Sequence, residues 1–131
     1  MKKFSIGIIA VTILIVGLGI FFVSKGSSSK PITYPLPANP TYYWGDGCPH
    51  CKIVEDFLST WDPPIGRAGK KVQIDKKEVW GSAANAKELK ARYEYCKVPQ
   101  SEMGVPLLFT PDGKCFSGDT EIINYLKNLE L

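Results

Sequence analysis

Near its N-terminus the chain carries twenty consecutive uncharged residues, FSIGIIAVTILIVGLGIFFV, from Phe4 to Val23. At about 1.5 Å rise per residue, a helix of this length spans roughly 30 Å, the thickness of the hydrocarbon core of a bilayer. A buried helix of a globular domain would usually carry a polar face, and this run offers only Ser5 and Thr12. The run therefore predicts a membrane-spanning helix, and the remaining chain is long enough for one domain.

The same run favours a retained anchor over a cleaved signal peptide. It is longer than the apolar core of about 7–15 residues in signal peptides, and no A-x-A-like cleavage site follows it. We therefore expect residues 1–23 to be a single-pass membrane anchor. The flanking lysines are Lys2 and Lys3 before the run and Lys25 and Lys30 after it. Together with the terminal amine, they favour a cytoplasmic N-terminus and an extracytoplasmic domain, in a periplasm or at a cell surface.

A segment rich in serine, glycine and proline follows, SKGSSSKPITYPLPANP at residues 24–40. Serine and glycine make its first part flexible, and four prolines stiffen the second. We expect residues 24–38 to be a linker and residues 39–131 to form the domain. The net charge of the whole chain is +3, and the domain has no basic stripe, so nothing indicates binding to nucleic acid.

Residues 39–131 alternate between strand and helix patterns. Strands are predicted at residues 41–44, 71–79, 105–110 and 115–118. Helices are predicted from Pro49 to before Pro63, from a cap at Ser82, and from a cap at Asp119 or Thr120. Their expected apolar faces carry Ile53, Val54, Phe57, Leu58 and Trp61, then Ala86, Leu89, Tyr93 and Cys96, then Ile122, Ile123, Leu126 and Leu129. The order β-α-β-α-β-β-α predicts an α/β fold with a four-stranded mixed sheet and helices on both faces.

Two of the four cysteines and the only histidine fall in the tetrad Cys48-Pro-His-Cys51. Three chemistries use such a pair: haem attachment, zinc binding and disulfide exchange. Haem attachment requires a histidine directly after the second cysteine, and Lys52 stands there. Zinc needs two further ligands, and Cys96 and Cys115 lack the paired spacing of zinc ribbons. A non-catalytic metal-binding or metal-delivery module stays as the alternative from a different functional class.

Disulfide exchange has a physical basis at this position. Cys48 lies between a predicted strand and a predicted helix, where free N–H groups and the helix dipole stabilise a thiolate. His50 adds a potential cation beside it. These effects are expected to lower the pKa of Cys48, which predicts that Cys48 is the reactive thiol. Cys51, one turn further along, is the resolving thiol.

The chain also resembles the thioredoxin superfamily. The resemblance rests on WGDGCPHC before an amphipathic helix, on GVP some fifty residues later, and on GKCFSGD before a last helix. The layout resembles the glutaredoxin-like branch most, and CPHC is similar to the motif of periplasmic disulfide oxidases. The resemblance covers residues 41–131. It implies a thioredoxin-like fold and thiol–disulfide exchange with protein substrates. A separate redox partner would recycle the pair, with neither metal nor organic cofactor.

The resemblance also assigns residues outside the tetrad. Pro106 is expected to be a cis-proline that faces the sulfurs, and Val105 is expected to present its backbone to substrate. SGDTE at residues 117–121 resembles the glutathione-carboxylate loop of glutaredoxins. Gly118 and Asp119 would then bind substrate in a glutathione-dependent reductase, although the same residues can equally form a plain helix cap.

Two departures argue against a dedicated thioredoxin-type reductase. Thioredoxins carry a buried aspartate near the strand that leads into their motif, and the only acid here is Asp46, which we expect to be exposed. The tryptophan that precedes the first cysteine in thioredoxins is Gly47 in this chain. The direction of electron flow, as oxidase, reductase or isomerase, stays open.

The order of elements predicts a second, structural disulfide between Cys96 and Cys115. The second helix runs back from the active-site end of the sheet and carries Cys96 to the opposite end. The strand from Pro106 also runs away from the active site, and the PDGK turn places Cys115 at the same far end. An extracytoplasmic location would keep this bridge oxidised. Two separate buried thiols are the alternative.

Overall fold

The computed structural model describes residues 33–66 and 68–129. The elements are β1 (Thr41–Trp44), α2 (Pro49–Thr60), β2 (Asp75–Glu78), α3 (Ala83–Tyr95), the 3-10 helix η1 (Gln100–Glu102), β3 (Leu107–Phe109), β4 (Cys115–Ser117) and α4 (Asp119–Lys127). The predicted order β-α-β-α-β-β-α is confirmed, with η1 as an addition. The bounds of β1 are those that its aromatic run predicted.

The four strands form one mixed sheet in the order β2-β1-β3-β4. Strand β1 pairs in parallel with β2, and Thr41 stands opposite Asp75 at the start of the pairing. Strand β3 is antiparallel to both β1 and β4. The predicted parallel first half and antiparallel second half are therefore both present. Because β1 and β2 run the same way, the loops that follow them lie at the same edge of the sheet.

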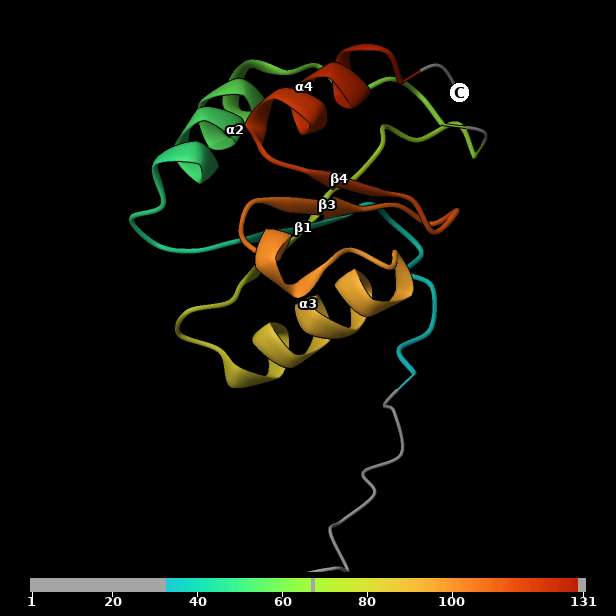
Figure 1. Ribbon diagram of the computed structural model, residues 1–131. Helices are drawn as coiled ribbons and strands as arrows, with labels where there is room; N and C mark the ends of the chain where they lie inside the picture. Colours follow the sequence, from blue (N-terminus) through green and yellow to red (C-terminus); the bar gives the residue numbers. More distant parts are fainter. Residues whose placement is uncertain (1–32, 67, 130–131) are drawn as a thin grey trace, which may run out of the picture. The chain divides into compact units, whose positions relative to one another are not determined.

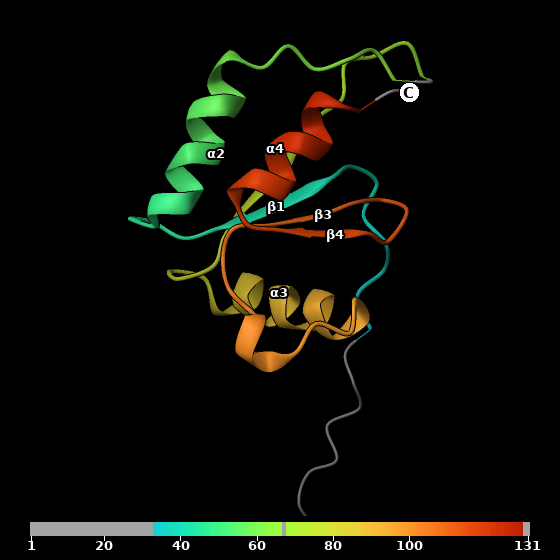
Figure 2. The same ribbon diagram turned by 45° about the horizontal axis from the view of Figure 1, so that its top comes forward.

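Helices cover both faces of the sheet, as predicted. Figures 1 and 2 show α2 and α4 on one face and α3 on the other. Successive residues of a strand point to opposite faces, so Tyr42 and Tyr43 of β1 enter different cores. The core under α2 and α4 contains Tyr42, Val54, Leu108, Ile122 and Leu126. The core over α3 contains Tyr43, Val79, Tyr93, Leu107 and Phe109.

Strand β2 is shorter than the prediction of residues 71–79. Val72 and Ile74 alternate as a strand would, but neither belongs to β2. The length of β2 is set by its partner, since the four residues of β1 are all that it can pair with. At its start Asp75 N donates to Pro40 O (2.9 Å), and Pro40 has no N–H to continue the ladder.

The predicted starts of α2 and α3 are confirmed, and the predicted cap of α4 is wrong. Pro49 opens α2, and the Ser82 side chain caps α3 by accepting from Asn85 N (3.3 Å). The predicted cap of α4, Asp119 or Thr120, is wrong: the cap is Gly118, with φ of 86° and no side-chain hydrogen bond. Glycine adopts this positive φ without the steric cost that a side chain carries. Ile53, assigned to the apolar face of α2, is 48% exposed.

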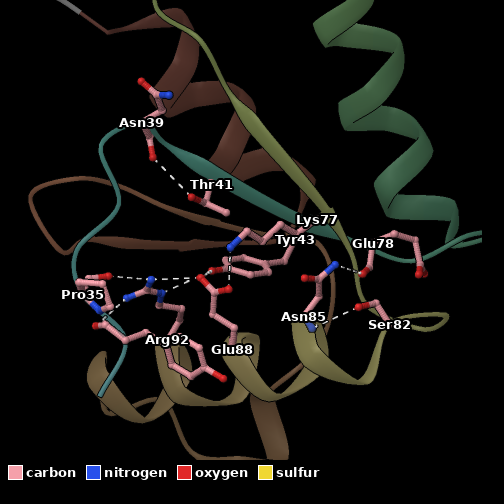
Figure 3. Close-up of polar contacts among 11 residues, drawn as sticks. Pro35, Asn39, Thr41, Tyr43, Lys77, Glu78, Ser82, Asn85, Glu88 and Arg92 are labelled. Carbon is pink, nitrogen blue, oxygen red and sulfur yellow. Dashed lines mark hydrogen bonds and ion pairs between the residues drawn. The ribbon is translucent and has the colours of Figure 1, made fainter. Parts of the chain in front are cut away.

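Helix α3 buries charged residues that its apolar pattern did not predict (Figure 3). The Arg92 side chain is 5% exposed and lies 3.1 Å from Glu88 Oε1. Glu88 also accepts from the Tyr43 hydroxyl (2.8 Å) and from Lys77 Nζ (2.6 Å). Burial alone would raise the pKa of Glu88, but these hydrogen bonds outweigh it and hold that pKa below its ordinary value. The network joins α3 to β1 and β2.

Arg92 also fastens the segment that precedes the sheet. It donates to the carbonyl oxygens of Tyr34 (3.3 Å) and Pro35 (2.9 Å). Residues from Thr33 onward belong to the same compact unit as the sheet, so the residues from 33 to 38 of the expected linker pack with the domain. The rest of the linker and the predicted anchor at residues 4–23 lie outside the described residues. Within the described ranges, no helix has the length and apolar character to cross a membrane.

Candidate active site

The two cysteines of the tetrad meet where β1 turns into α2. Strand β1 ends at Trp44, and the short loop that follows includes Gly47 at φ of 75°. Cys48 is the N-cap of α2, and its own N–H donates to Gly45 O (3.2 Å). Cys48 and Cys51 are joined by a disulfide with a Cα–Cα distance of 5.2 Å.

The two sulfurs have different environments. Cys48 Sγ accepts a hydrogen bond from Cys51 N (3.2 Å), so it satisfies one of the free N–H groups of the first helical turn. Cys48 is 7% exposed and Cys51 is 2% exposed. The carbonyl oxygen of Cys51 accepts from the buried Tyr42 hydroxyl (3.1 Å), which ties this turn to the sheet. Cys48 is therefore the slightly more exposed residue of the two, and its sulfur has a donor placed to stabilise negative charge.

The Val105-Pro106 segment lies beside this pair. The peptide bond between Val105 and Pro106 is cis, and Val105 O lies 3.7 Å from Cys48 Sγ. The segment is held from α3, because the Tyr93 hydroxyl donates to Gly104 O (2.6 Å) and accepts from Gly104 N (3.2 Å). Tyr93 was expected only as a core residue, and its apolar periodicity carries no signal for this hydroxyl contact.

His50 meets a carboxylate from the last helix. Its Nδ1 lies 3.1 Å from Asp119 Oδ2, although the two residues are 69 positions apart in the sequence. The His50 side chain is 68% exposed and that of Asp119 is 20% exposed. The hydrogen bond with His50, aided by the Thr120 backbone N–H, holds the pKa of Asp119 below its ordinary value. Asp119 therefore carries a negative charge beside His50 over the neutral pH range.

Backbone N–H groups at the start of α4 already donate to acceptors within the chain. Gly118 N donates to Pro106 O (3.0 Å), which links the start of α4 to the cis-proline. Thr120 N donates to Asp119 Oδ1 (2.7 Å), and Ser117 N donates to Glu121 Oε2 (3.1 Å). An anion placed here would compete with these acceptors and meet two negative side chains. Gly118 and Asp119 thus lie at the same edge as Cys48, but their contacts are with Pro106 and His50.

The other two cysteines are joined to each other away from this edge. Cys96 caps the C-terminus of α3, and Cys115 opens β4 opposite Phe109. A disulfide links them with a Cα–Cα distance of 6.3 Å. The four sulfurs therefore form two separate pairs. In the part of the chain that the structure describes, no three His, Cys, Asp or Glu side chains gather as a set of metal ligands.

A comparison of the chain with protein-family models found no match, and searches of curated proteins and of solved structures found none either.

Proposed function

We propose that this chain is a membrane-tethered thiol–disulfide oxidoreductase with a thioredoxin-like fold of the glutaredoxin-like type, acting on protein thiols and disulfides outside the cytoplasm. One observation carries the proposal. The Cys48–Cys51 disulfide opens α2, with Cys48 Sγ on the Cys51 N–H and 3.7 Å from the carbonyl oxygen of Val105.

The chemistry consists of two exchanges. A substrate thiolate attacks Cys48 Sγ, the Cys48–Cys51 bond breaks, and Cys51 leaves as a thiolate. A second substrate thiolate then attacks the substrate sulfur of the mixed disulfide, and Cys48 leaves as a thiolate. Two electrons pass to the chain, and the substrate thiols release two protons. In the opposite direction, the Cys48 thiolate attacks a substrate disulfide and Cys51 resolves the mixed disulfide.

The surroundings of Cys48 suit this role. The Cys51 N–H and the positive end of the α2 dipole stabilise the thiolate that either direction requires. The greater exposure of Cys48 makes it the sulfur that a protein substrate reaches first. A substrate chain bonded to Cys48 would pass along the Val105 backbone, whose carbonyl oxygen is already close to that sulfur.

The contacts at the start of α4 favour protein substrates over glutathione. A glutathione carboxylate would need backbone N–H groups there, and those of Thr120 and Ser117 already donate to Asp119 and Glu121. A glutathione-dependent reductase is therefore the second candidate within the same chemistry. The metal-binding module receives less support. It would need Cys96 and Cys115 as ligands beside Cys48 and Cys51, and those two cysteines bond to each other instead.

A redox titration combined with zinc analysis of the purified protein tests the proposal. We expect metal-free protein with one two-electron transition assigned to Cys48–Cys51. A potential near roughly −120 mV would mark an oxidant, and one near roughly −270 mV a reductant. Stoichiometric zinc bound to the cysteine thiolates would exclude the proposed function.

The roles of the two sulfurs can be tested separately. Alkylation of the reduced protein at mildly acidic pH should modify Cys48 before Cys51, because Cys48 is the more exposed of the two and its sulfur accepts from an N–H donor. Peptide mass mapping identifies the modified residue. Faster modification of Cys51 would reverse the assignment.

A further inference from the structure

An exposed tryptophan stands at the same sheet edge as Cys48. Trp80 is 62% exposed and follows the end of β2. The last pair of the parallel ladder joins Trp44 to Glu78, and Val79 N donates to Trp44 O (2.9 Å) beyond it. The loop that carries Trp80 therefore lies next to the loop that leads from β1 to Cys48.

The indole ring packs directly on that loop. A Cβ atom built on Gly45 would lie 2.5 Å from both Cδ2 and Cε2 of Trp80, so only glycine allows this approach. Gly45 O in turn accepts the N–H of Cys48 (3.2 Å). One side of the ring thus covers the backbone that orients the reactive cysteine, and much of the rest of the ring is open to solvent.

The backbone that carries the ring is held in place. The Glu78 carboxylate accepts from Trp80 N and from Gly81 N, each at 2.7 Å. The Glu78 carbonyl oxygen accepts from Asn85 Nδ2 (2.8 Å), and Ser82 caps the helix that follows; Figure 3 shows these groups at the start of α3. An aromatic side chain on a fixed backbone loses little conformational entropy when a partner covers it.

We propose that Trp80 determines substrate specificity, by receiving an apolar or aromatic side chain adjacent to the substrate cysteine that bonds to Cys48. The proposal rests on the proposed thiol–disulfide exchange. The occupant is a polypeptide segment, since the ring adjoins the loop of Cys48 and the backbone of Val105 adjoins the sulfur itself. A small thiol such as dithiothreitol reacts at Cys48 without reaching the ring.

The test compares two reduced peptides that have the same length and charge and contain two cysteines each. One carries leucine next to its first cysteine and the other carries glycine. The oxidised full-length chain, kept soluble in mild detergent, reacts with each peptide and with dithiothreitol in single-turnover experiments. The leucine peptide should react about fivefold to tenfold faster than the glycine peptide, the effect expected when part of a leucine side chain is buried against the ring.

Variants identify the ring as the source of this preference. Trp80→Ala should reduce the ratio of the two peptide rates to near one and leave the dithiothreitol rate unchanged, whereas Trp80→Phe should retain part of the preference. Gly45→Ala should also lower the ratio, because the added Cβ displaces the ring. The matched control is Tyr95→Ala: Tyr95 is a 57% exposed aromatic that packs on Gly113 in the turn between β3 and β4. This control should keep the full ratio.

The measurements distinguish failure of the specificity role from failure of the proposed function. An unchanged peptide ratio in Trp80→Ala would overturn the specificity role. An equal loss of the peptide and dithiothreitol rates would assign Trp80 to support of the active-site loop instead. A change in oligomeric state by light scattering with an unchanged ratio would assign the ring to contact with a second copy. If the wild-type chain oxidises no thiol, dithiothreitol included, the proposed function fails and this inference fails with it.

Discussion

At the residue scale, His50 and Asp119 are the charged or chargeable pair that lies at the start of α2. The first turn of α2 contains no acidic residue, and His50 lies between the two cysteines in the sequence. Asp119 comes from the opposite end of the domain sequence and contacts His50 at 3.1 Å. The contact with Asp119 holds the imidazole in place. A positive charge on His50 would stabilise the Cys48 thiolate and hence the reduced state of the pair.

Removing either member of this contact should make the disulfide less oxidising. His50→Ala should lower the reduction potential by tens of millivolts, since 30 mV corresponds to about 1.4 kcal/mol. Asp119→Asn should lower it by about 10–20 mV, the equivalent of an exposed ion pair worth at most about 1 kcal/mol. Equilibration with glutathione redox buffers measures both values. Asp56→Asn, which removes an exposed partner of Lys52 on α2, is the matched control and should change nothing.

The contact between His50 and Asp119 should depend on pH, because the pKa of Asp119 is lowered in the folded protein. Because the folded-state pKa of Asp119 lies below its ordinary value, the contact contributes at pH values above about 4 and is lost as the pH falls through the folded pKa. The gap in potential between wild type and Asp119→Asn should therefore disappear as the pH falls through the folded-state pKa of Asp119. An unchanged potential in His50→Ala would leave His50 without a redox role.

At the scale of elements, α3 is attached to the sheet by a polar network as well as by apolar packing. Glu88 stands at its centre, with Tyr43 from β1, Lys77 from β2 and Arg92 from its own helix as partners. Arg92 also lies over the Phe109 ring at 4.5 Å from the centroid. Because Arg92 is almost fully buried, loss of its acceptor would leave a charge without compensation.

Replacement of Glu88 tests this attachment. Glu88→Gln should lower the free energy of unfolding at pH 7 by about 2 kcal/mol, the scale for a lost buried partner of charged donors. The folded-state pKa of Glu88 is depressed, so its contribution is present above about pH 4.3 and disappears as the pH falls through the folded pKa. Urea unfolding should therefore show a smaller difference between variant and wild type at acidic pH than at pH 7.

The control for this prediction lies on the same helix. Glu94→Gln removes an exposed carboxylate 4.0 Å from Lys90 and should change the stability by less than about 0.5 kcal/mol. Equal effects of the two substitutions would show that burial of the network does not matter for stability.

At the scale of the whole molecule, the two disulfides occupy separate positions and should have separable roles. The Cys96–Cys115 bridge closes a sequence separation of 19 residues between α3 and β4. In the chain-entropy model, removal of such a bridge costs about 3 kcal/mol of stability. The double substitution Cys96→Ala with Cys115→Ala should lower the melting temperature and leave the dithiothreitol rate of Cys48–Cys51 near that of wild type. A lost exchange rate with unchanged stability would contradict a structural role.

The second prediction at the scale of the whole molecule concerns the predicted membrane anchor. With residues 4–23 in a bilayer, carbonate extraction should leave the full-length protein in the membrane pellet. A chain that begins at Thr33 should stay in the supernatant and keep the Arg92 contacts with Tyr34 and Pro35. Extraction of the full-length protein into the supernatant, or a mature N-terminus near Ser27, would exclude a retained anchor.

Much of the fold could be predicted from local sequence signals. The order of the elements, the bounds of β1, the start of α2 at Pro49 and the Ser82 cap follow from periodicity and from side chains that act within one turn. The placement of Cys48 and Cys51 is local in the same sense, because a strand followed by a helix brings a CxxC pair to the first helical turn. Interactions between neighbours in sequence are sufficient for all of these features.

Only the tertiary structure decided the features that depend on distant partners. The length of β2 was set by the four residues of β1. The cap of α4 is Gly118 rather than Asp119 or Thr120, and the N–H of Gly118 donates to Pro106 O. The contact of His50 with Asp119 and the packing of Trp80 on Gly45 join segments without any shared local pattern. Such contacts arise when helices and loops dock on the sheet, and local propensity carries no information about which side chains then meet. The sequence by itself therefore determined the elements and the cysteine pair, and the packing of those elements determined the charges and surfaces around it.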